Sequence, residues 1–177
     1  GSVLIDLRSQ EEFTSGFVPG SIFFEQKQLK DYAPLFLKQG DQVVFIINPS
    51  DENSLESIIA KSGIKNQSSY FLAEGEGWRQ PARFDLVIAV DAGEMSLDIK
   101  FDDNIVLADL RDASQFQEKH VAGSTSLPFA ELTDVAQIAD LDEEGTIYLY
   151  SDKTGDAVTA ASLLKKHEIH NIRIVNG

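Results

Sequence analysis

A stretch of 19 residues occurs twice in this chain, and this internal repeat constrains the fold more than any other feature of the sequence. Residues 3–21 align without gaps with residues 106–124 at an offset of 103, and nine of the nineteen positions are identical. Unrelated segments would share roughly one or two residues by chance. The identical pairs are Val3/Val106, Leu4/Leu107, Asp6/Asp109, Leu7/Leu110, Arg8/Arg111, Phe13/Phe116, Val18/Val121, Gly20/Gly123 and Ser21/Ser124. The sequence therefore predicts a duplicated structural unit.

The segments that follow each copy predict strands alternating with helices. At the same offset, the apolar run at residues 43–47 corresponds to 146–150, and each run precedes a helical pattern. In the second copy this helix covers residues 157–166, with Ala157, Ala160, Ala161 and Leu164 on one face; Leu55, Ile58 and Ile59 have matching spacing in the first. Short strands are expected next at residues 70–72 and 172–174. This alternation predicts an α/β fold, in which each copy has a small central, mostly parallel sheet flanked by helices.

Two domains are predicted, residues 1–80 and 81–177, because residues 76–83 combine glycine, proline and charge between two periodic regions. Trp78, close to this boundary, is expected to be a packing residue. We expect the first domain to be truncated at its N-terminus and the second at its C-terminus. The initial Gly1-Ser2 resembles a cloning remnant, which suggests a piece of a longer protein.

The second copy has a segment in front of it that the first copy lacks. Residues 86–90 form an apolar run that predicts a strand, and residues 91–99 predict a short helix. Asp91 is the expected N-cap of this helix, because its side chain can accept a hydrogen bond from a free backbone N–H of the first turn.

Charge and composition exclude several classes of function. The formal net charge is −14, from 29 acidic and 15 basic residues, so nucleic acids and anionic membranes are not expected partners. The longest apolar runs, such as 43–47, are much shorter than the roughly 18 residues of a membrane helix. The chain contains no cysteine, which excludes a disulfide, a thiolate metal site and a cysteine nucleophile.

The repeated motif resembles that of the rhodanese-like (sulfurtransferase) family: Asp-x-Arg, an aromatic residue seven positions after the Asp, and an apolar-x-Gly-Ser turn. Residues 6–21 and 160–171 resemble, more closely, the C-terminal tandem rhodanese region of bacterial metallo-β-lactamase–rhodanese fusion proteins. The resemblance implies a cytoplasmic bacterial parent with a metal-dependent hydrolase in its N-terminal remainder, for example one that acts on glutathione persulfides or thioesters. That remainder is the expected partner of the chain, and homo-oligomers are a further possibility.

Active members of the family carry a persulfide on a cysteine at a strand end before a helix. The chemistry needs a thiolate, which is nucleophilic near neutral pH and can hold a transferable sulfur. In the second copy the matching position is Ser151, followed by Asp152, Lys153, Thr154, Gly155 and Asp156; the family's loop arginine is replaced by Asp156. In the first copy the offset of 103 gives Asn48. The resemblance therefore implies a catalytically inactive module, with an interaction or structural role in a larger hydrolase.

Two other functions remain open. The loop could belong to a residual sulfurtransferase or an anion-binding domain that uses Ser151 and Lys153, although no histidine close to Ser151 in sequence could activate it. A small-molecule pocket between the copies is the third possibility.

The remaining charged residues have simpler expected roles. Asp51, Glu52, Asp152 and Asp156 are predicted to cap the helices and complement their dipoles. The pairs Asp6/Arg8 and Asp109/Arg111 are predicted to be structural at strand ends. No metal or cofactor is predicted, because the histidines, His120, His167 and His170, form no ligand motif; the last two are expected near a helix C-terminus.

Overall fold

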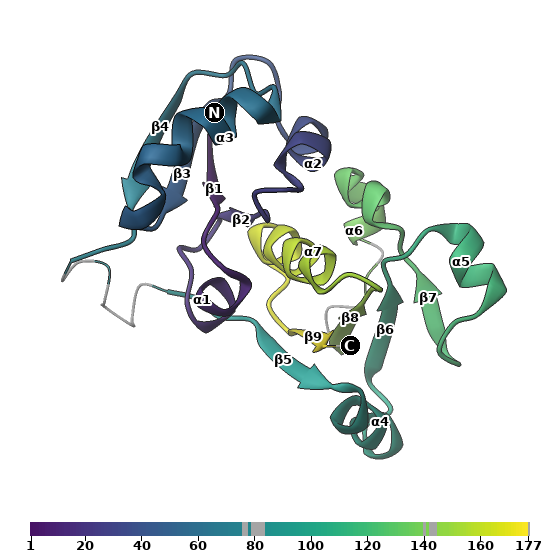
Figure 1. Cartoon of the computed structure of the whole chain (residues 1–177). Helices are drawn as coiled ribbons and strands as arrows, with labels where there is room; N and C mark the ends of the chain where they lie inside the picture. Colours follow the sequence, from purple (N-terminus) through teal and green to yellow (C-terminus); the bar gives the residue numbers. More distant parts are fainter. Residues whose placement is uncertain (76–77, 79–83, 140, 142–144, 177) are drawn as a thin grey trace. The chain divides into compact units, whose positions relative to one another are not determined.

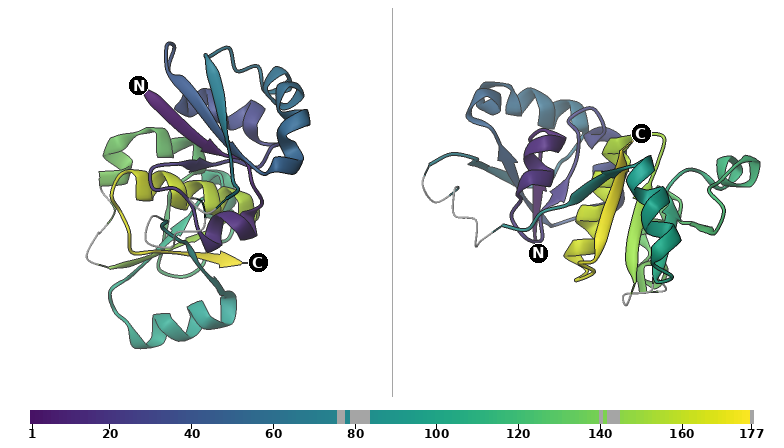
Figure 2. Two further views of the ribbon diagram at one scale, coloured as in Figure 1. Left: turned by 90° about the vertical axis from the view of Figure 1, so that its left-hand side faces the viewer. Right: turned by 90° about the horizontal axis from the view of Figure 1, so that it is seen from below.

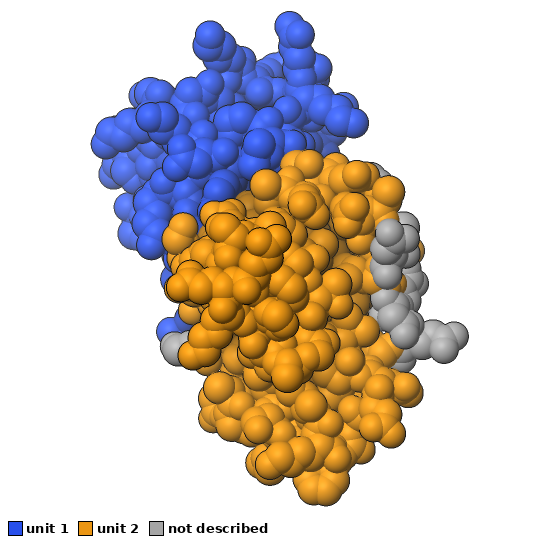
Figure 3. Space-filling view, turned by 90° about the vertical axis from the view of Figure 1, so that its right-hand side faces the viewer, with its two compact units in different colours: residues 1–86 blue, residues 87–177 orange. Residues whose placement is uncertain are grey.

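The computed structural model describes residues 1–75, 78, 84–139, 141 and 145–176. The chain divides into two compact units, Gly1–Leu86 and Val87–Gly177 (Figure 3). The boundary predicted between residues 80 and 81 lies outside the described residues.

The first unit is built on a parallel sheet with the strand order β2-β1-β3-β4 (Figure 1). Its strands are β1 (Ser2–Asp6), β2 (Ile22–Phe23), β3 (Gln42–Ile47) and β4 (Ser68–Leu72). Its helices are α1 (Gln10–Ser15), α2 (Leu29–Phe36) and α3 (Leu55–Ser62), with the 3-10 helix η1 (Pro49–Ser54) before α3. Aromatic side chains fill the core, where the fully buried Phe13 stacks on Phe17 with 4.3 Å between ring centroids.

The second unit has a parallel sheet with the strand order β5-β9-β8-β6-β7. Its strands are β5 (Ile88–Asp91), β6 (Ile105–Asp109), β7 (Ser124–Ser126), β8 (Thr146–Tyr150) and β9 (Ile172–Asn176). The helices are α4 (Ala92–Phe101), α5 (Ala113–Glu118), α6 (Val135–Ala139) and α7 (Thr154–Lys166), with the 3-10 helix η3 (Phe129–Thr133). Figure 2 shows α4 and α7 on opposite faces of this sheet. The predicted α/β fold with parallel sheets flanked by helices is confirmed; the assignment of each copy as a separate rhodanese-like domain stays a prediction.

Short helices in this fold begin with reciprocal hydrogen bonds between the N-cap and the third helical residue. Ser9 and Glu12 form such a capping box at α1, and Asp91 and Glu94 form one at α4. The Asp91 carboxylate accepts from the Glu94 N–H at 2.8 Å, which confirms its predicted role as N-cap. These boxes satisfy backbone donors that a helix leaves free in its first turn.

Helix α7 differs from its prediction in length and in burial. It begins at Thr154, three residues before the predicted start at 157, and residues 155–165 are all buried. The predicted apolar face is buried, but so are Val158, Thr159 and Ser162 elsewhere on the helix. Besides β8 and β9, α7 also contacts η3, so more than the single predicted face is buried. No described helix combines the length and apolarity needed to cross a membrane.

A polar network under α4 joins three elements of the second unit. Tyr148 of β8 is 1% exposed, and its hydroxyl donates to the Asp98 carboxylate of α4. Arg173 of β9 also donates to Asp98, with 3.0 Å between Nη1 and Oδ2. Burial, together with the hydrogen bond to Asp98, raises the pKa of Tyr148 to about 12.

We expect the second unit to lose stability as pH rises from about 10 to about 12. In this window the unfolded chain releases the Tyr148 proton while the folded chain keeps it, so the unfolded state binds fewer protons and is favoured. A titration of tyrosine absorbance near 295 nm should show a step near pH 12 that Tyr148→Phe removes and Tyr70→Phe keeps. If that step survives in Tyr148→Phe, the network does not hold the proton.

Candidate functional site

The Asp-x-Arg motif forms an ion pair at the end of the first strand in both copies. Arg8 Nη2 lies 2.7 Å from Asp6 Oδ2, and Arg111 Nη2 lies 2.6 Å from Asp109 Oδ2. Each guanidinium also donates to a backbone carbonyl after the following helix, that of Gly16 at 2.9 Å or of Lys119 at 2.7 Å. The motif therefore clamps the strand end to the turn beyond α1 or α5.

The two ion pairs differ in how much of the arginine side chain is exposed to solvent. The side chain of Arg8 is 4% exposed, whereas that of Arg111 is 20% exposed. Burial raises the pKa of Asp6 even though hydrogen bonds from Arg8 oppose the shift. At Asp109 burial also acts to raise the pKa, but the hydrogen bonds from Arg111 outweigh it and the pKa is lowered.

The structure corrects the predicted match between Asn48 and Ser151. In the first unit Val3 pairs with Val43, whereas its counterpart Val106 pairs with Ile147, so the offset between β3 and β8 is 104. Backbone hydrogen bonds agree, because Leu7 N donates to Ile46 O and Leu110 N donates to Tyr150 O. Ser151 therefore corresponds to Ile47, and Asn48 corresponds to Asp152.

Side chains confirm the corrected register. Asn48 Nδ2 donates to Glu12 Oε2 at 3.0 Å, and in the second unit Gln115 Nε2 donates to Asp152 Oδ2 at 3.4 Å. Glu12 and Gln115 occupy the same helix position in the two copies. Ile47 is 0% exposed, so the first unit presents no polar side chain where the second presents Ser151.

The loop after β8 contains the predicted residues Ser151 to Asp156; Asp156 lies in the first turn of α7, as predicted for a partner of the helix dipole, but Asp152 does not cap the helix. Lys153 is the N-cap residue, and its side chain makes no capping hydrogen bond. The Asp152 carboxylate instead accepts from the Ser151 hydroxyl at 3.3 Å, while Asp156 is 6% exposed in the first helical turn. Thr154 and Gly155 begin the helix. The predicted capping role of Asp152 is wrong, because the side chain turns back toward Ser151 and Gln115.

In the first unit Asp51 and Glu52 lie in the first turn of η1, as predicted for partners of the helix dipole, but the predicted capping is not seen for Glu52. No side chain caps η1, where Asn48 is the N-cap residue. Glu52 accepts from the Tyr70 hydroxyl, with 2.6 Å between Oε1 and the phenolic oxygen. Its carboxylate is therefore directed toward β4 and not toward the free N–H groups of the helix.

Hollows border the Asp–Arg pair in both units, and their charges differ. In the second unit a cavity of about 360 Å³ is lined by Arg111, Lys119, His120, Val121, Tyr150, Ser151 and Asp152. In the first unit a cavity of about 430 Å³ is lined by Arg8 and by three carboxylates, those of Glu12, Glu25 and Asp51. We call these the basic hollow and the acidic hollow.

Sequence reasoning missed His120 as a neighbour of Ser151. The two residues line the basic hollow together, although 31 positions separate them in the chain. His120 Nδ1 lies 2.8 Å from the Phe116 carbonyl oxygen, and its ring stacks on Phe116 with 4.1 Å between centroids. A hydrogen bond to a carbonyl requires a proton on Nδ1 and leaves Nε2 as the acceptor of the neutral ring.

Trp78 contacts residues of the first unit on two sides. Its ring lies 5.0 Å from that of Phe84 in an edge-on arrangement, and the Arg8 guanidinium lies 4.6 Å above it. These contacts agree with a packing role and add a cation–π interaction to the Asp6–Arg8 pair.

One family model matches part of the second half of the chain. The family model of the rhodanese-like domain matches residues 93–177. No curated protein sequence matches the chain.

Solved structures of low sequence identity are also similar to the chain. SseA from Escherichia coli, a 3-mercaptopyruvate sulfotransferase, is 16% identical over 99% of this chain and 91% of that chain, with a TM-score of 0.43. The rhodanese-like domain of Alr3790 from Anabaena sp is 22% identical over 50% of this chain and 67% of that chain, with a TM-score of 0.46. Thiosulfate sulfurtransferase from Pseudomonas aeruginosa is 16% identical over 99% of this chain and 40% of that chain, with a TM-score of 0.41.

Proposed function

Because residues 93–177 match the family model of the rhodanese-like domain, we propose that the chain is a non-catalytic pair of rhodanese-like units with an interaction or structural role in a larger protein. The observation that carries this proposal is the chemistry of one position in each unit. The strand end that requires a thiolate for sulfur transfer has Ser151 in one unit and the buried Ile47 in the other. With no cysteine anywhere in the chain, no side chain can form a persulfide.

The surroundings of Ser151 also oppose sulfur transfer. Asp152 lies against its hydroxyl, and Asp156 occupies the first turn of α7 where a cation would favour an anionic substrate. A negative charge beside a thiol disfavours the thiolate and repels thiosulfate. The loop therefore lacks the nucleophile, and its negative charges also disfavour a thiolate and an anionic substrate.

We further propose that the larger protein is a bacterial, cytoplasmic metallo-β-lactamase-fold hydrolase whose N-terminal remainder is the partner of this chain. This part of the proposal rests on the sequence resemblance of residues 6–21 and 160–171. It is tested by the upstream reading frame of the natural gene, which should encode a histidine- and aspartate-rich metal motif of the HxHxDH type. An immediate start codon ahead of Val3 would reject it.

In a thiosulfate:cyanide sulfurtransferase assay we expect the unmodified chain to show no activity above the uncatalysed rate. The Ser151→Cys variant should also be silent, because Asp152 and Asp156 remain. Asn48→Cys is the matched control, since it introduces a thiol in the other unit at the counterpart of Asp152.

Each result in this assay has a separate meaning. Activity of the unmodified chain would overturn the proposed function. Activity of Ser151→Cys alone would show that the scaffold is competent and that only the nucleophile has been lost. Intact fold in every variant is checked by circular dichroism.

A second candidate function is anion binding at the basic hollow. The observation that favours it is the meeting of Arg111, Lys119 and the Ser151 hydroxyl around one cavity of about 360 Å³. Asp109 already pairs with Arg111, and the Asp152 carboxylate also lines this cavity, so both acids weaken the attraction. Calorimetric titration with thiosulfate or phosphate tests this function: binding that Lys119→Ala weakens would support it, and no heat at millimolar anion would reject it.

A further inference from the structure

No strand among the described residues pairs with the outer edge of β4 in the first unit, and we call this the open edge of β4. β4 pairs with β3 on one side and ends the strand order of its sheet. Strands of parallel sheets are normally buried on both faces. In β4, however, four of five residues are exposed, and Tyr70 and Phe71 are 48% and 52% exposed. The sequence Ser68–Leu72 contains no proline, lysine or other charge that would protect such an edge from pairing.

The second unit shows how the equivalent strand is completed. Register pairs relate β4 to β9 at the offset of 104, since Val43 pairs with Ser68 and Ile147 pairs with Ile172. The outer edge of β9 carries β5 in parallel, with Ala89 opposite Ile174 and Val90 opposite Val175. Ile174 and Val175 are 1% and 8% exposed, whereas their counterparts Tyr70 and Phe71 are about half exposed.

Helix α4, which follows β5, supplies the rest of the cover in the second unit. Val175 belongs to a buried cluster with Val90 of β5 and Met95 of α4. Phe71 is the counterpart of Val175, and its only described ring contact is Trp78 at 5.9 Å between centroids. The first unit thus leaves exposed an apolar strand edge and face. In the second unit, one strand and one helix cover the equivalent positions.

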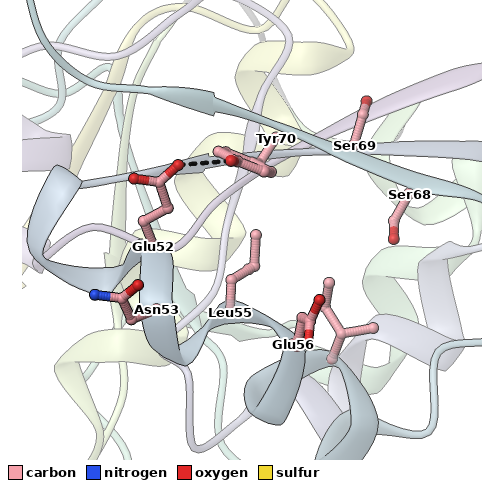
Figure 4. Close-up of a pocket in the computed structure, with 8 residues that line it drawn as sticks. Glu52, Asn53, Leu55, Glu56, Ser68, Ser69 and Tyr70 are labelled. Carbon is pink, nitrogen blue, oxygen red and sulfur yellow. Dashed lines mark hydrogen bonds between the residues drawn. The ribbon is translucent and has the colours of Figure 1, made fainter.

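The opposite face of β4 is hollowed as well. A cavity of about 490 Å³ lies between β4 and the segment of η1 and α3, lined by residues that include Glu52, Leu55, Ser68 and Tyr70. Figure 4 shows Glu52 and Tyr70 at one end of this cavity, joined by their hydrogen bond, and Ser68 along β4. The face of β4 toward η1 and α3 is therefore not fully packed.

We propose that the open edge of β4 binds a parallel β-strand followed by a helix, in the arrangement of β5 and α4, and that another segment of the larger protein supplies it. This inference rests on the proposed function, which makes the chain part of a larger protein. The bound strand lies opposite residues 69–72, with a small residue beside Tyr70 and a β-branched residue beside Phe71, as Ala89 and Val90 lie beside β9. Backbone hydrogen bonds provide the affinity and the side-chain positions provide the register.

The chain also specifies one chemical difference between this bound helix and α4. In the second unit Asp98 of α4 accepts hydrogen bonds from Tyr148 and Arg173. Their counterparts in the first unit are Val44 and Ser69, which offer no cation and no phenol. The helix that covers β4 therefore carries an uncharged residue at the position of Asp98, because a carboxylate there would lose its partners on burial.

The probe for this edge is a synthetic peptide with the sequence of residues 86–101 and the substitution Asp98→Leu. At saturating peptide we expect amide hydrogen exchange of residues 68–72 to slow by at least about tenfold in the full chain. The unsubstituted peptide is the matched control and should bind more weakly. Phe71→Asp, at an exposed position, should abolish the protection, whereas Phe101→Asp in the second unit should not.

Three results would overturn the proposal. These are unchanged exchange of residues 68–72 at millimolar peptide, protection confined to β9, and a dimer of the unmodified chain that Phe71→Asp dissociates. The last result would identify a second copy as the occupant. The sulfurtransferase assay on the same sample separates the two proposals, because activity would reject the proposed function and leave the peptide result unaffected.

Discussion

Replacing Asp6 with alanine is expected to destabilise the first unit by about 3–5 kcal/mol, because it leaves a buried arginine without its counter-ion. The Arg8 side chain is 4% exposed and has its hydrogen bonds directed to Asp6 and to the Gly16 carbonyl. Urea unfolding followed by tryptophan fluorescence measures the effect in this unit, since Trp78 is the single tryptophan of the chain.

The second copy provides the matched control for this experiment. Asp109→Ala removes the same partner from Arg111, whose side chain is 20% exposed and can regain hydration. We expect a smaller loss of about 1.5–3 kcal/mol, measured by circular dichroism. The double variant Asp6→Leu, Arg8→Leu should cost less than Asp6→Ala, since it leaves no unpaired charge. Equal losses for Asp6→Ala and Asp109→Ala would contradict the argument from burial.

Replacing Phe13 with alanine is expected to cost the first unit about 3–5 kcal/mol, the usual loss for a fully buried aromatic ring. The Phe13 ring is 0% exposed, stacks on Phe17 at 4.3 Å and lies 5.1 Å from the ring of Phe23. Its removal leaves a cavity that rigid aromatic neighbours cannot fill.

Phe116 occupies the same motif position in the second copy and serves as the control. Its ring is half-buried and stacks on the exposed His120. Phe116→Ala should cost about 1–2 kcal/mol, because less apolar area returns to water. Urea unfolding of both variants compares the two losses, and a loss for Phe116→Ala as large as that for Phe13→Ala would show that the motif position, and not burial, sets the cost.

The repeat and the alternation of apolar segments were enough to predict the α/β fold and its parallel sheets. They could not give the register between the copies. The connection from Ser21 to β3 contains 20 residues and that from Ser124 to β8 contains 21, so one inserted residue shifts the offset from 103 to 104. Both offsets superimpose two apolar strands, and hydrophobic pattern alone does not distinguish them.

The site was predictable only where its residues are close in the sequence. Ser151 and its acidic loop follow directly from the strand end, and Asp91 follows from its capping pattern. His120 reaches the basic hollow because the turn after α5 lies beside the end of β8, where the Tyr150 hydroxyl bonds to Ser124 at 2.9 Å. The proximity of His120 to Ser151 depends on tertiary contacts, which a sequence motif does not contain.

The two hollows are lined by different charges, and this difference determines how many anions the duplicated chain can bind. Three carboxylates line the acidic hollow, while Arg111 and Lys119 face one carboxylate in the basic hollow. The two hollows are also not equivalent surfaces of the repeat, because they share only the positions Arg8/Arg111 and Asn48/Asp152. An anion that binds the basic hollow therefore has no second site of the same kind in the acidic hollow, and its titration into the whole chain should saturate at one equivalent.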